Sequence, residues 1–378
     1  MSFIDLILIA LLLICVALVV YPFVLYPVIL MLLPRRPPAP APDAARPSVS
    51  MLFCAFNEGA AMPAKIANMD LLKARHPDMQ ILAFDDGSED DTATRLAARP
   101  DLIELVRGGG RSGKAHGMKL LAARARGDVL VFTDANVTLA PDAIDALLAY
   151  YADGQVGGVL GSLHYLGEGD SATASVGSLY WRLEEWLKDG ESRSGNVLGA
   201  DGSIFSVRRA LYPDFPDTVL DDLTVSMSVI FAGQRLIKAK DVIAYERLVA
   251  ARGDEYRRKV RIAARAWHTH GYLRPQICRM ALLDRFKYAS RKMVRWFGGV
   301  FILIGAAAAV ALAWRISPWL ALGLLGAMLL FGLAAARLRR GPVAAVVDIL
   351  IAYAATLQGV GRAMRGRTMA VWKPAKSR

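Results

Sequence analysis

The feature that most constrains this chain is an uncharged apolar run of 28 residues, 6–33, near its beginning. At a helical rise of about 1.5 Å per residue, such a run is long enough to cross a hydrocarbon layer roughly 30 Å thick. Pro22 and Pro27 lie inside the run and predict a kink. No basic segment precedes the run and no small-residue cleavage pattern follows it, so we interpret residues 1–33 as a transmembrane anchor and not as a signal peptide.

A proline-rich stretch follows the apolar run. Residues 34–47 contain six prolines, which predicts a stiff linker. Arg35 and Arg36 follow the apolar run almost directly. Because Lys and Arg collect on the cytoplasmic side of membrane segments, the sequence predicts that the domain after the linker is cytosolic.

A second apolar region closes the chain. Residues 281–296 alternate apolar and basic positions, which predicts a helix lying at the cytosolic interface. Residues 297–361 hold the remaining apolar runs, of which 297–314 and 317–336 predict a membrane hairpin. The chain is therefore expected to be a multi-pass protein of the inner (cytoplasmic) membrane.

The last apolar run, 343–360, carries Asp348 and precedes a basic tail, 362–378, with six Lys and Arg residues. A full third crossing would place this tail outside, against the distribution of positive charge. We therefore favour a re-entrant or interfacial segment over a full crossing.

The net charge of +12 is concentrated beside the apolar stretches, which 16 of the 46 Lys and Arg residues flank. The polar domain is close to neutral, which argues against a nucleic-acid-binding protein. Three widely spaced cysteines exclude a disulfide scaffold and a zinc ribbon.

Residues 48–280 alternate short buried strands with helical patterns, which predicts an α/β domain with a parallel sheet. Strands are expected at 48–56, 80–86, 102–106 and 128–134, and helices at 60–75, 89–98, 113–126 and 141–151. Ligands of such sheets bind at the carboxyl ends of the strands. Asp85, Asp86 and Asp134 all fall at strand ends, which makes them the first candidate site residues.

One glycine-rich segment imitates a nucleotide-binding loop. Residues 108–114 read GGGRSGK, but Ala115 stands where a phosphate-binding loop requires Ser or Thr for its Mg²⁺. The segment would also follow the third strand and not the first. An NTPase is therefore disfavoured.

Two further groups of charged residues are candidates for the functional site. Asp221 and Asp222 stand at a predicted helix start, and Arg258, Arg261 and Arg265 share one face of a later helix. Taken singly, the acids are ordinary helix-start residues and the arginines an ordinary solvated face. Together they suit a reaction in which a carboxylate accepts a proton and cations neutralise a departing diphosphate.

The combination of motifs is more specific than any of its parts. In order, the chain contains FNE, DDGS, GKA, DAN, GADGS, DD and a closing RxxxRAW, between apolar membrane segments. This pattern resembles the membrane-bound family 2 glycosyltransferases of the bacterial exopolysaccharide type, related to poly-N-acetylglucosamine, hyaluronan and cellulose synthases. The resemblance implies a GT-A (Rossmann-like) fold and inversion at the anomeric carbon.

The resemblance also implies a nucleotide-sugar donor, a UDP-sugar by expectation, and a Mg²⁺ or Mn²⁺ ion on its diphosphate. Asp134 would be the main metal ligand, and Asn136 holds the last position of the same motif. The residues implied in binding the donor are Phe56, Asn57, Glu58, Asp85, Asp86, Lys114 and Asp134.

On the acceptor side, Asp222 matches the general base and Asp221 precedes it where the family usually has Glu. The partners implied are a membrane lipid or lipid-linked glycan acceptor and polysaccharide-assembly proteins. The remaining residues implied at the acceptor and leaving group are Gly199, Asp201, Gly202, Arg258, Arg261, Arg265 and Trp267.

The chain departs from the family pattern at several points. Asn136 is a weaker metal ligand than the usual acid, and Lys119 stands where Asn is common. The closing motif has no Gln, whereas the intact motif of the family accompanies processive synthesis. We therefore expect transfer to a membrane acceptor without extrusion of a long polymer.

Other functions stay open. A processive polysaccharide synthase is one alternative, and a catalytically inactive assembly scaffold is another. A polyprenyl-phosphate sugar synthase is the nearest different enzyme, but it generally lacks an element like Arg261–Trp267. A transporter would need more charged groups within its apolar segments than Asp348 provides.

Overall fold

One mixed sheet of eight strands organises the computed structural model, which describes all residues except 167–171, 248–251, 338–341 and 367–378. The strand order is β3-β2-β1-β4-β7-β6-β8-β5. The strands are β1 Val49–Ala55, β2 Gln80–Asp85, β3 Glu104–Arg107, β4 Val129–Thr133, β5 Thr138–Leu139, β6 Val156–Leu166, β7 Ile204–Arg208 and β8 Arg235–Arg247. The four strands expected from the sequence are β1 to β4, and they pair in parallel as predicted.

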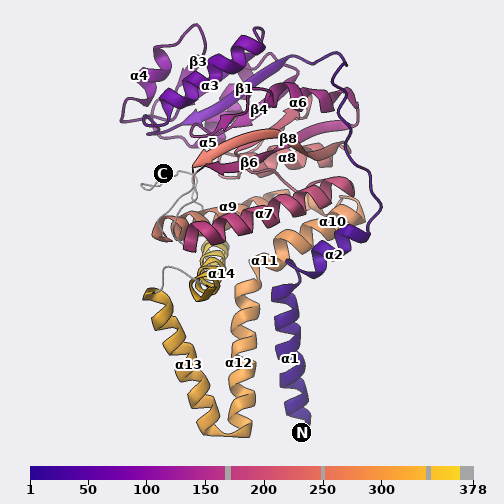
Figure 1. The fold of residues 1–378 in the computed structure, drawn as a ribbon, viewed down its shortest axis with the longest axis vertical. Coiled ribbons are helices and arrows are strands. Elements are labelled where there is room, and N and C mark those ends of the chain that lie inside the picture. The colour runs from indigo at the N-terminus through magenta and orange to yellow at the C-terminus, as the bar shows by residue number, and fades with distance from the viewer. Residues whose placement is uncertain (167–171, 248–251, 338–341, 367–378) are drawn as a thin grey trace.

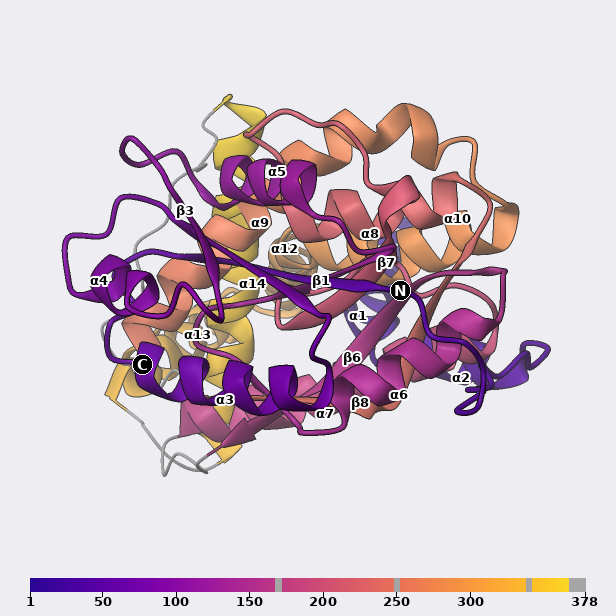
Figure 2. The same cartoon turned by 90° about the horizontal axis from the view of Figure 1, so that it is seen from above.

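Helices cover both faces of the sheet (Figure 2). The helices of the domain are α3 Met62–Arg75, α4 Thr92–Ala97, α5 Lys114–Arg124, α6 Ala143–Ala149, α7 Ala172–Arg193, α8 Asp221–Phe231 and α9 Arg252–Ile277. Side chains of α3, α4 and α6 share one hydrophobic core, and those of α5, α8 and α9 share the other. In β1, Met51 and Phe53 face the first core while Leu52 and Cys54 face the second, because successive strand side chains point to opposite faces. This is why β1 is apolar throughout.

The second half of the sheet reverses direction. Strand β7 runs antiparallel to both β4 and β6, and β8 pairs in parallel with β6. The reversal next to β4 ends the parallel half of the sheet beside the strand that precedes Asp134. The edge that collects Asp85 and Asp134 is thereby bordered by the loop that precedes β7.

The N-terminal apolar run divides into two helices. Helix α1 spans Phe3–Val20, and α2 spans Leu25–Leu32 after a break next to Pro22. Helix α2 turns away and packs on α7, where Leu30 and Leu187 are buried together. The sequence predicts a kinked single span, whereas the structure leaves 18 residues in α1 and places the rest along the domain.

Within the described residues, three helices are long and apolar enough to cross a membrane: Phe3–Val20, Gly298–Ile316 and Val346–Met364. The last two belong to α12 Gly298–Ile316 and α14 Pro342–Met364, and α13 Pro318–Arg337 lies between them in the chain. Figure 1 shows α1, α12 and α13 extending together from one side of the domain. Gly305 of α12 lets α1 approach closely, because an added Cβ would lie 3.2 Å from Cβ of Cys15.

Helix α14 has a different orientation. It packs along α9 and runs crosswise to α12, as Figures 1 and 2 show together. By length and composition the helix could also cross a membrane, so the interfacial or re-entrant placement stays a prediction.

The segment 281–296 is held by the domain more firmly than the sequence indicates. It forms α10 Leu282–Tyr288, a π-helical turn Ala289–Met293 and α11 Val294–Trp296. Its side chains Lys287 and Arg291 are buried. An amphipathic surface helix is expected to hold its basic side chains in solvent or among headgroups, so this part of the prediction differs from the structure.

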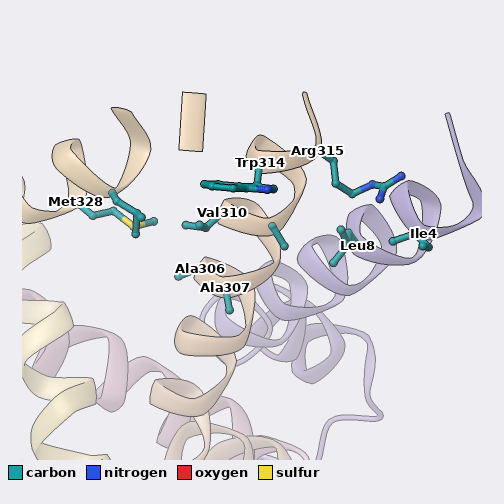
Figure 3. Close-up of a pocket in the computed structure, with 10 residues that line it drawn as sticks. Ile4, Leu8, Ala306, Ala307, Val310, Trp314, Arg315 and Met328 are labelled. Atoms are coloured by element: carbon teal, nitrogen blue, oxygen red, sulfur yellow. The ribbon is translucent and has the colours of Figure 1, made fainter. Parts of the chain in front are cut away.

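An apolar cavity of about 780 Å³ lies among the far ends of α1, α12 and α13. Figure 3 shows Ile4, Leu8, Val310 and Trp314 around it. The cavity contains none of the acidic residues singled out above, so it is not the candidate active site.

Candidate active site

The acid at the end of β4, Asp134, meets a lysine at the carboxyl edge of the sheet. Lys114 begins α5, and its Nζ lies 2.6 Å from Oδ1 of Asp134, which follows β4. The same Nζ lies 3.9 Å from Oδ2 of Asp221, at the start of α8. Burial alone would lower the pKa of Lys114, but the carboxylates of Asp134 and Asp221 raise it above its ordinary value. Three segments far apart in the sequence therefore share one fixed positive charge.

The turn after β4 is fastened by a second, fully buried lysine. Nζ of Lys65 on α3 donates to the backbone oxygens of Asp134 at 2.9 Å and Val137 at 2.7 Å. Burial lowers the pKa of Lys65 to about 7. This contact leaves the side chain of Asp134 pointing out of the turn, with 36% of it exposed.

Asn136 has a fixed amide orientation. Its Nδ2 donates to Oε1 of Glu246 on β8 at 2.9 Å. Since a carboxylate only accepts hydrogen bonds, the amide nitrogen must face Glu246 and the amide oxygen must face away. Asn136 thus offers an oxygen, and not a nitrogen, to any cation beside Asp134.

Asp222 combines partial exposure with a perturbed acidity. It is half-buried, and its Oδ1 accepts from the backbone N–H of Leu223 at 2.7 Å. Burial and the neighbouring charge of Asp221 raise the pKa of Asp222 to about 6, against the opposing effects of Lys114 and Arg265. A carboxylate with a pKa just below neutrality is suited to accept a proton and is still ionised at pH 7.

Asp86 holds the glycine-rich loop. Its buried carboxylate accepts from the backbone N–H of Ser112 at 2.7 Å and of Gly113 at 2.9 Å. The guanidinium of Arg111, in the same loop, lies 3.3 Å from the ring centre of Phe56. The segment that imitates a phosphate-binding loop is therefore part of the wall of this site, anchored by Asp86.

The segments after β1 and β2 are joined by hydrogen bonds. Asn57 adopts the left-handed conformation with φ 52°, and its side-chain oxygen accepts from the N–H of Glu89 at 2.8 Å. The backbone N–H of Glu58 donates to Thr92 at 2.9 Å. Asp85 is buried and accepts from the N–H of Ser88 at 3.3 Å. The first two motifs thus form one unit at the edge of the sheet.

The loop before β7 reaches the same place. A Cβ added to Gly202 would lie 2.8 Å from Nζ of Lys114 and 3.2 Å from Oδ2 of Asp134. Only glycine leaves this space open beside the two charged groups. Asp201 is turned the other way and pairs with the buried Lys188 of α7. Burial would raise the pKa of Asp201, but the Lys188 ammonium lowers it to about 2.

Helix α9 contacts the segment that leads into Asp221 and Asp222. The buried Arg265 donates to the backbone oxygen of Val219 at 2.8 Å, and Thr269 accepts from the N–H of Leu220 at 2.8 Å. These two contacts fix the segment that enters Asp221 and Asp222. Arg265 therefore positions the two acids, whereas the sequence places it among the residues of the leaving group.

The remaining candidate residues on α9 lie in two separate parts of the helix. Arg258 forms an ion pair with Glu255, with 2.8 Å between Nε and Oε2. It also interacts electrostatically with Glu246, the residue that accepts a hydrogen bond from Asn136, so Arg258 lies on the Asn136 side of the site. Arg261 is half-buried one helical turn further along. Trp267 belongs instead to an aromatic cluster with Trp296 and Phe297, next to the start of α12.

Comparison with known proteins identifies the family. The model of glycosyl transferase family 2 matches residues 50–214. An N-acetylglucosaminyltransferase of Rhizobium leguminosarum bv. trifolii is 30% identical over 137 residues, which are 34% of this chain and 74% of that protein. The chain belongs to glycosyl transferase family 2.

A solved structure shares the fold of this transferase over nearly its full length. The mannosyltransferase of Pyrobaculum calidifontis, solved with GDP-Man and Mn²⁺, has a TM-score of 0.74 and covers 97% of this chain and 100% of its own, at 21% identity. The transferase therefore has a GT-A fold, as expected from its motifs, and it is a glycosyltransferase.

Sequence patterns single out neither Lys65 nor Glu246 nor Lys188, which the structure places around the site of the transferase. Lys65 could be recognised from the sequence, because its helical spacing from Met62, Met69 and Leu72 puts it on the apolar face of α3. A lysine inside an apolar stripe indicates a buried, hydrogen-bonded ammonium. Glu246 and Lys188 could not be recognised in this way, because their partners are far away in the chain.

Proposed function

We propose that this transferase moves a sugar from a nucleotide sugar, a UDP-sugar by expectation, to a lipid-linked or other membrane-associated acceptor, with inversion at the anomeric carbon. The observation that carries the proposal is the grouping of Lys114, Asp134 and Asp221 at the carboxyl edge of the sheet, with Asp222 beside them. This edge is where ligands of open α/β sheets bind. The pathway proposed is bacterial polysaccharide synthesis, with assembly proteins as partners.

The site fits a divalent cation that is completed by substrate oxygens. Asp134 offers a partly exposed carboxylate, and Asn136 offers an amide oxygen because Glu246 occupies its nitrogen. Hard cations such as Mg²⁺ and Mn²⁺ take oxygen ligands of this kind. Within the described residues, no three His, Cys, Asp or Glu side chains are grouped to hold a metal. We therefore infer that the donor diphosphate supplies the other ligands, and that the cation would stabilise the charge of the leaving nucleoside diphosphate.

The reaction then follows from the residue types. The acceptor hydroxyl oxygen attacks the anomeric carbon while its proton passes to the carboxylate of Asp222. The bond from that carbon to the diphosphate oxygen breaks, and the nucleoside diphosphate leaves with the electron pair. Lys114 provides a positive charge next to Asp134 for the departing group. Gly202 leaves room for the sugar beside these two side chains.

The membrane segments favour an acceptor at the bilayer surface. Helix α9 supports Asp221 and Asp222 on one side and packs on the crosswise α14 on the other. We infer that α14 lies at headgroup depth, so that the domain is cytosolic and its active site faces a lipid-borne substrate. The membrane part then consists of α1, α12, α13 and the interfacial α14. These are few helices to enclose a polysaccharide channel, so we propose addition of one or a few sugars.

Purified protein in detergent, given a panel of UDP- and GDP-sugars with and without a lipid-linked primer, tests this proposal. We expect release of nucleoside diphosphate from one donor class, stimulated by the primer, and a product one or a few sugars longer. No release from any donor would indicate a catalytically inactive assembly scaffold. A ladder of long products would indicate a processive synthase.

A further inference from the structure

A lysine beside the candidate acceptor loop has no carboxylate in direct contact within the described residues, although three lie near enough to act on its charge. Lys292 lies in the π-helical turn Ala289–Met293 between α10 and α11 and is half-buried. Within the described parts of the chain, its ammonium takes part in no hydrogen bond and no ion pair. Its neighbour Arg291, in contrast, is fully engaged, with Glu191 at 2.6 Å and Glu184 at 3.1 Å. Single π-turns inside α-helical segments are frequent at functional sites.

The ammonium points toward the loop that borders the acids. A Cβ added to Gly199 would lie 3.4 Å from Nζ of Lys292 and 2.6 Å from Cδ1 of Leu223. Leu223 directly follows Asp222, and the next loop residue, Ala200, donates its N–H to Ser226 of α8 at 2.8 Å. Lys292 and Asp222 therefore lie on the same side of this loop, where an acceptor would enter.

The charge of this lysine persists near neutral pH. Burial, reinforced by the charge of Arg291, lowers the pKa of Lys292 to about 8, whereas Glu191, Glu184 and Asp222 oppose the shift. A partly buried cation without a partner is costly, and an anion brought by a ligand would remove that cost. A compact ammonium is a suitable point charge for a phosphate oxygen.

The position of Lys292 relative to the membrane-length helices indicates which kind of phosphate it binds. Only five residues separate it from Gly298, where the membrane-length helix α12 begins. Trp296 and Phe297 follow Lys292 by four and five residues and form an aromatic cluster with Trp267, and aromatic residues of this kind concentrate at membrane interfaces. A phosphate that reaches Lys292 is therefore expected to carry a lipid chain.

We propose that Lys292 binds a phosphate oxygen in the lipid linkage of a lipid-linked glycan acceptor and so holds the acceptor hydroxyl beside Asp222. This inference rests on the proposed function, because it names the chemical class of the acceptor in the same reaction. It assigns Lys292 to the acceptor site, to which the motifs of the sequence do not assign it.

Binding of short lipid phosphates to the detergent-solubilised full chain tests this inference. The probes are farnesyl phosphate, uncharged farnesol and phosphatidylglycerol, each added to wild type, Lys292→Met, Lys292→Arg and the control Arg285→Met. Arg285 is an exposed cation on the same segment, so its removal changes the charge but not the proposed site. Thermal unfolding shows whether each variant is folded.

We expect Lys292→Met to weaken farnesyl phosphate binding about 10-fold or more, the usual effect of losing one charge-assisted hydrogen bond. Farnesol binding should not change, Lys292→Arg should keep part of the affinity, and Arg285→Met should behave as wild type. Equal affinity of wild type and Lys292→Met for farnesyl phosphate would overturn the inference. An equal loss for phosphatidylglycerol would also overturn it, because the site would then hold bulk lipid headgroups.

Activity separates this inference from the function on which it rests. Because the inference places Lys292 at the acceptor and not at the donor, Lys292→Met should raise the KM for a lipid-linked acceptor more than it lowers kcat. Absence of donor turnover in wild type would contradict the proposed function, whereas the binding measurement would still decide the role of Lys292.

Discussion

Replacing Asp222 with Asn lowers turnover at least ~100-fold and leaves donor binding unchanged, because the amide keeps the shape of the side chain but cannot accept the proton of the acceptor hydroxyl. Steady-state kinetics and titration of the donor check the two halves of this expectation. Burial and the charge of Asp221 raise the pKa of Asp222 to about 6. Activity of the wild type should therefore fall as the pH drops below about 6, since the base becomes protonated.

Asp221→Asn provides the matched control for Asp222→Asn. It removes one of the charges that raise the pKa of Asp222, so we expect the acidic limb of the pH profile to move to lower pH with a smaller loss of turnover. A crippled Asp221→Asn enzyme beside a mild Asp222→Asn enzyme would assign the base to the other carboxylate. Because Asp222 has a higher pKa folded than unfolded, its ionisation costs stability above about pH 6, and Asp222→Asn should unfold no earlier than wild type at pH 7.5.

Replacing Asp134 with Ala should also lower turnover at least ~100-fold, the usual cost of losing an electrostatic contact to the transition state. The change removes the main candidate metal ligand and the partner of Lys114. Chelation with EDTA should abolish wild-type activity, and added Mg²⁺ or Mn²⁺ should restore it. Full activity without any divalent cation would contradict the assignment of Asp134 as a metal ligand.

Two further variants sharpen the test of Asp134. Asn136→Asp adds a carboxylate beside Asp134 and should lower the Mn²⁺ concentration needed for half-maximal activity. Asp142→Asn removes an exposed acid near α6 and should leave that concentration as in wild type. If Asn136→Asp has no effect on the metal requirement, Asn136 does not contact the cation.

The carboxyl edge of the sheet was predictable because its signals are local. An uninterrupted apolar strand followed by an acid is visible within ten residues, and parallel pairing then brings the ends of β2 and β4 to the same edge. The fold class followed from the same alternation. The grouping of Asp85 and Asp134 thus needed no knowledge of side-chain contacts.

Long-range pairing was not predictable in the same way. Lys188 meets Asp201, Glu246 meets Asn136, and no local pattern connects these positions in the sequence. The segment 281–296 shows the same difficulty. Its alternation of apolar and basic residues is equally consistent with two placements: basic side chains at a lipid surface, or basic side chains paired with buried carboxylates. The structure shows the second, because Arg291 pairs with Glu184 and Glu191 of α7.

The N-terminal run illustrates a limit of hydropathy. Residues 6–33 carry no charge, so the sequence indicates one long span that is only kinked at its prolines. The break beside Pro22 turns α2 onto α7, where the hydroxyl of the buried Tyr26 donates to Glu191 at 2.6 Å. A tyrosine with a buried hydrogen-bond partner is compatible with a domain interface as much as with a membrane.

The anomeric configuration of the first transferred sugar tests the central claim most directly. A single displacement with Asp222 as base must invert the configuration at the anomeric carbon. Proton NMR of the product formed from an α-linked nucleotide sugar should therefore show a β-linkage in the initial product, before any re-equilibration. An α-linkage would contradict the single displacement and the role of Asp222 as its base.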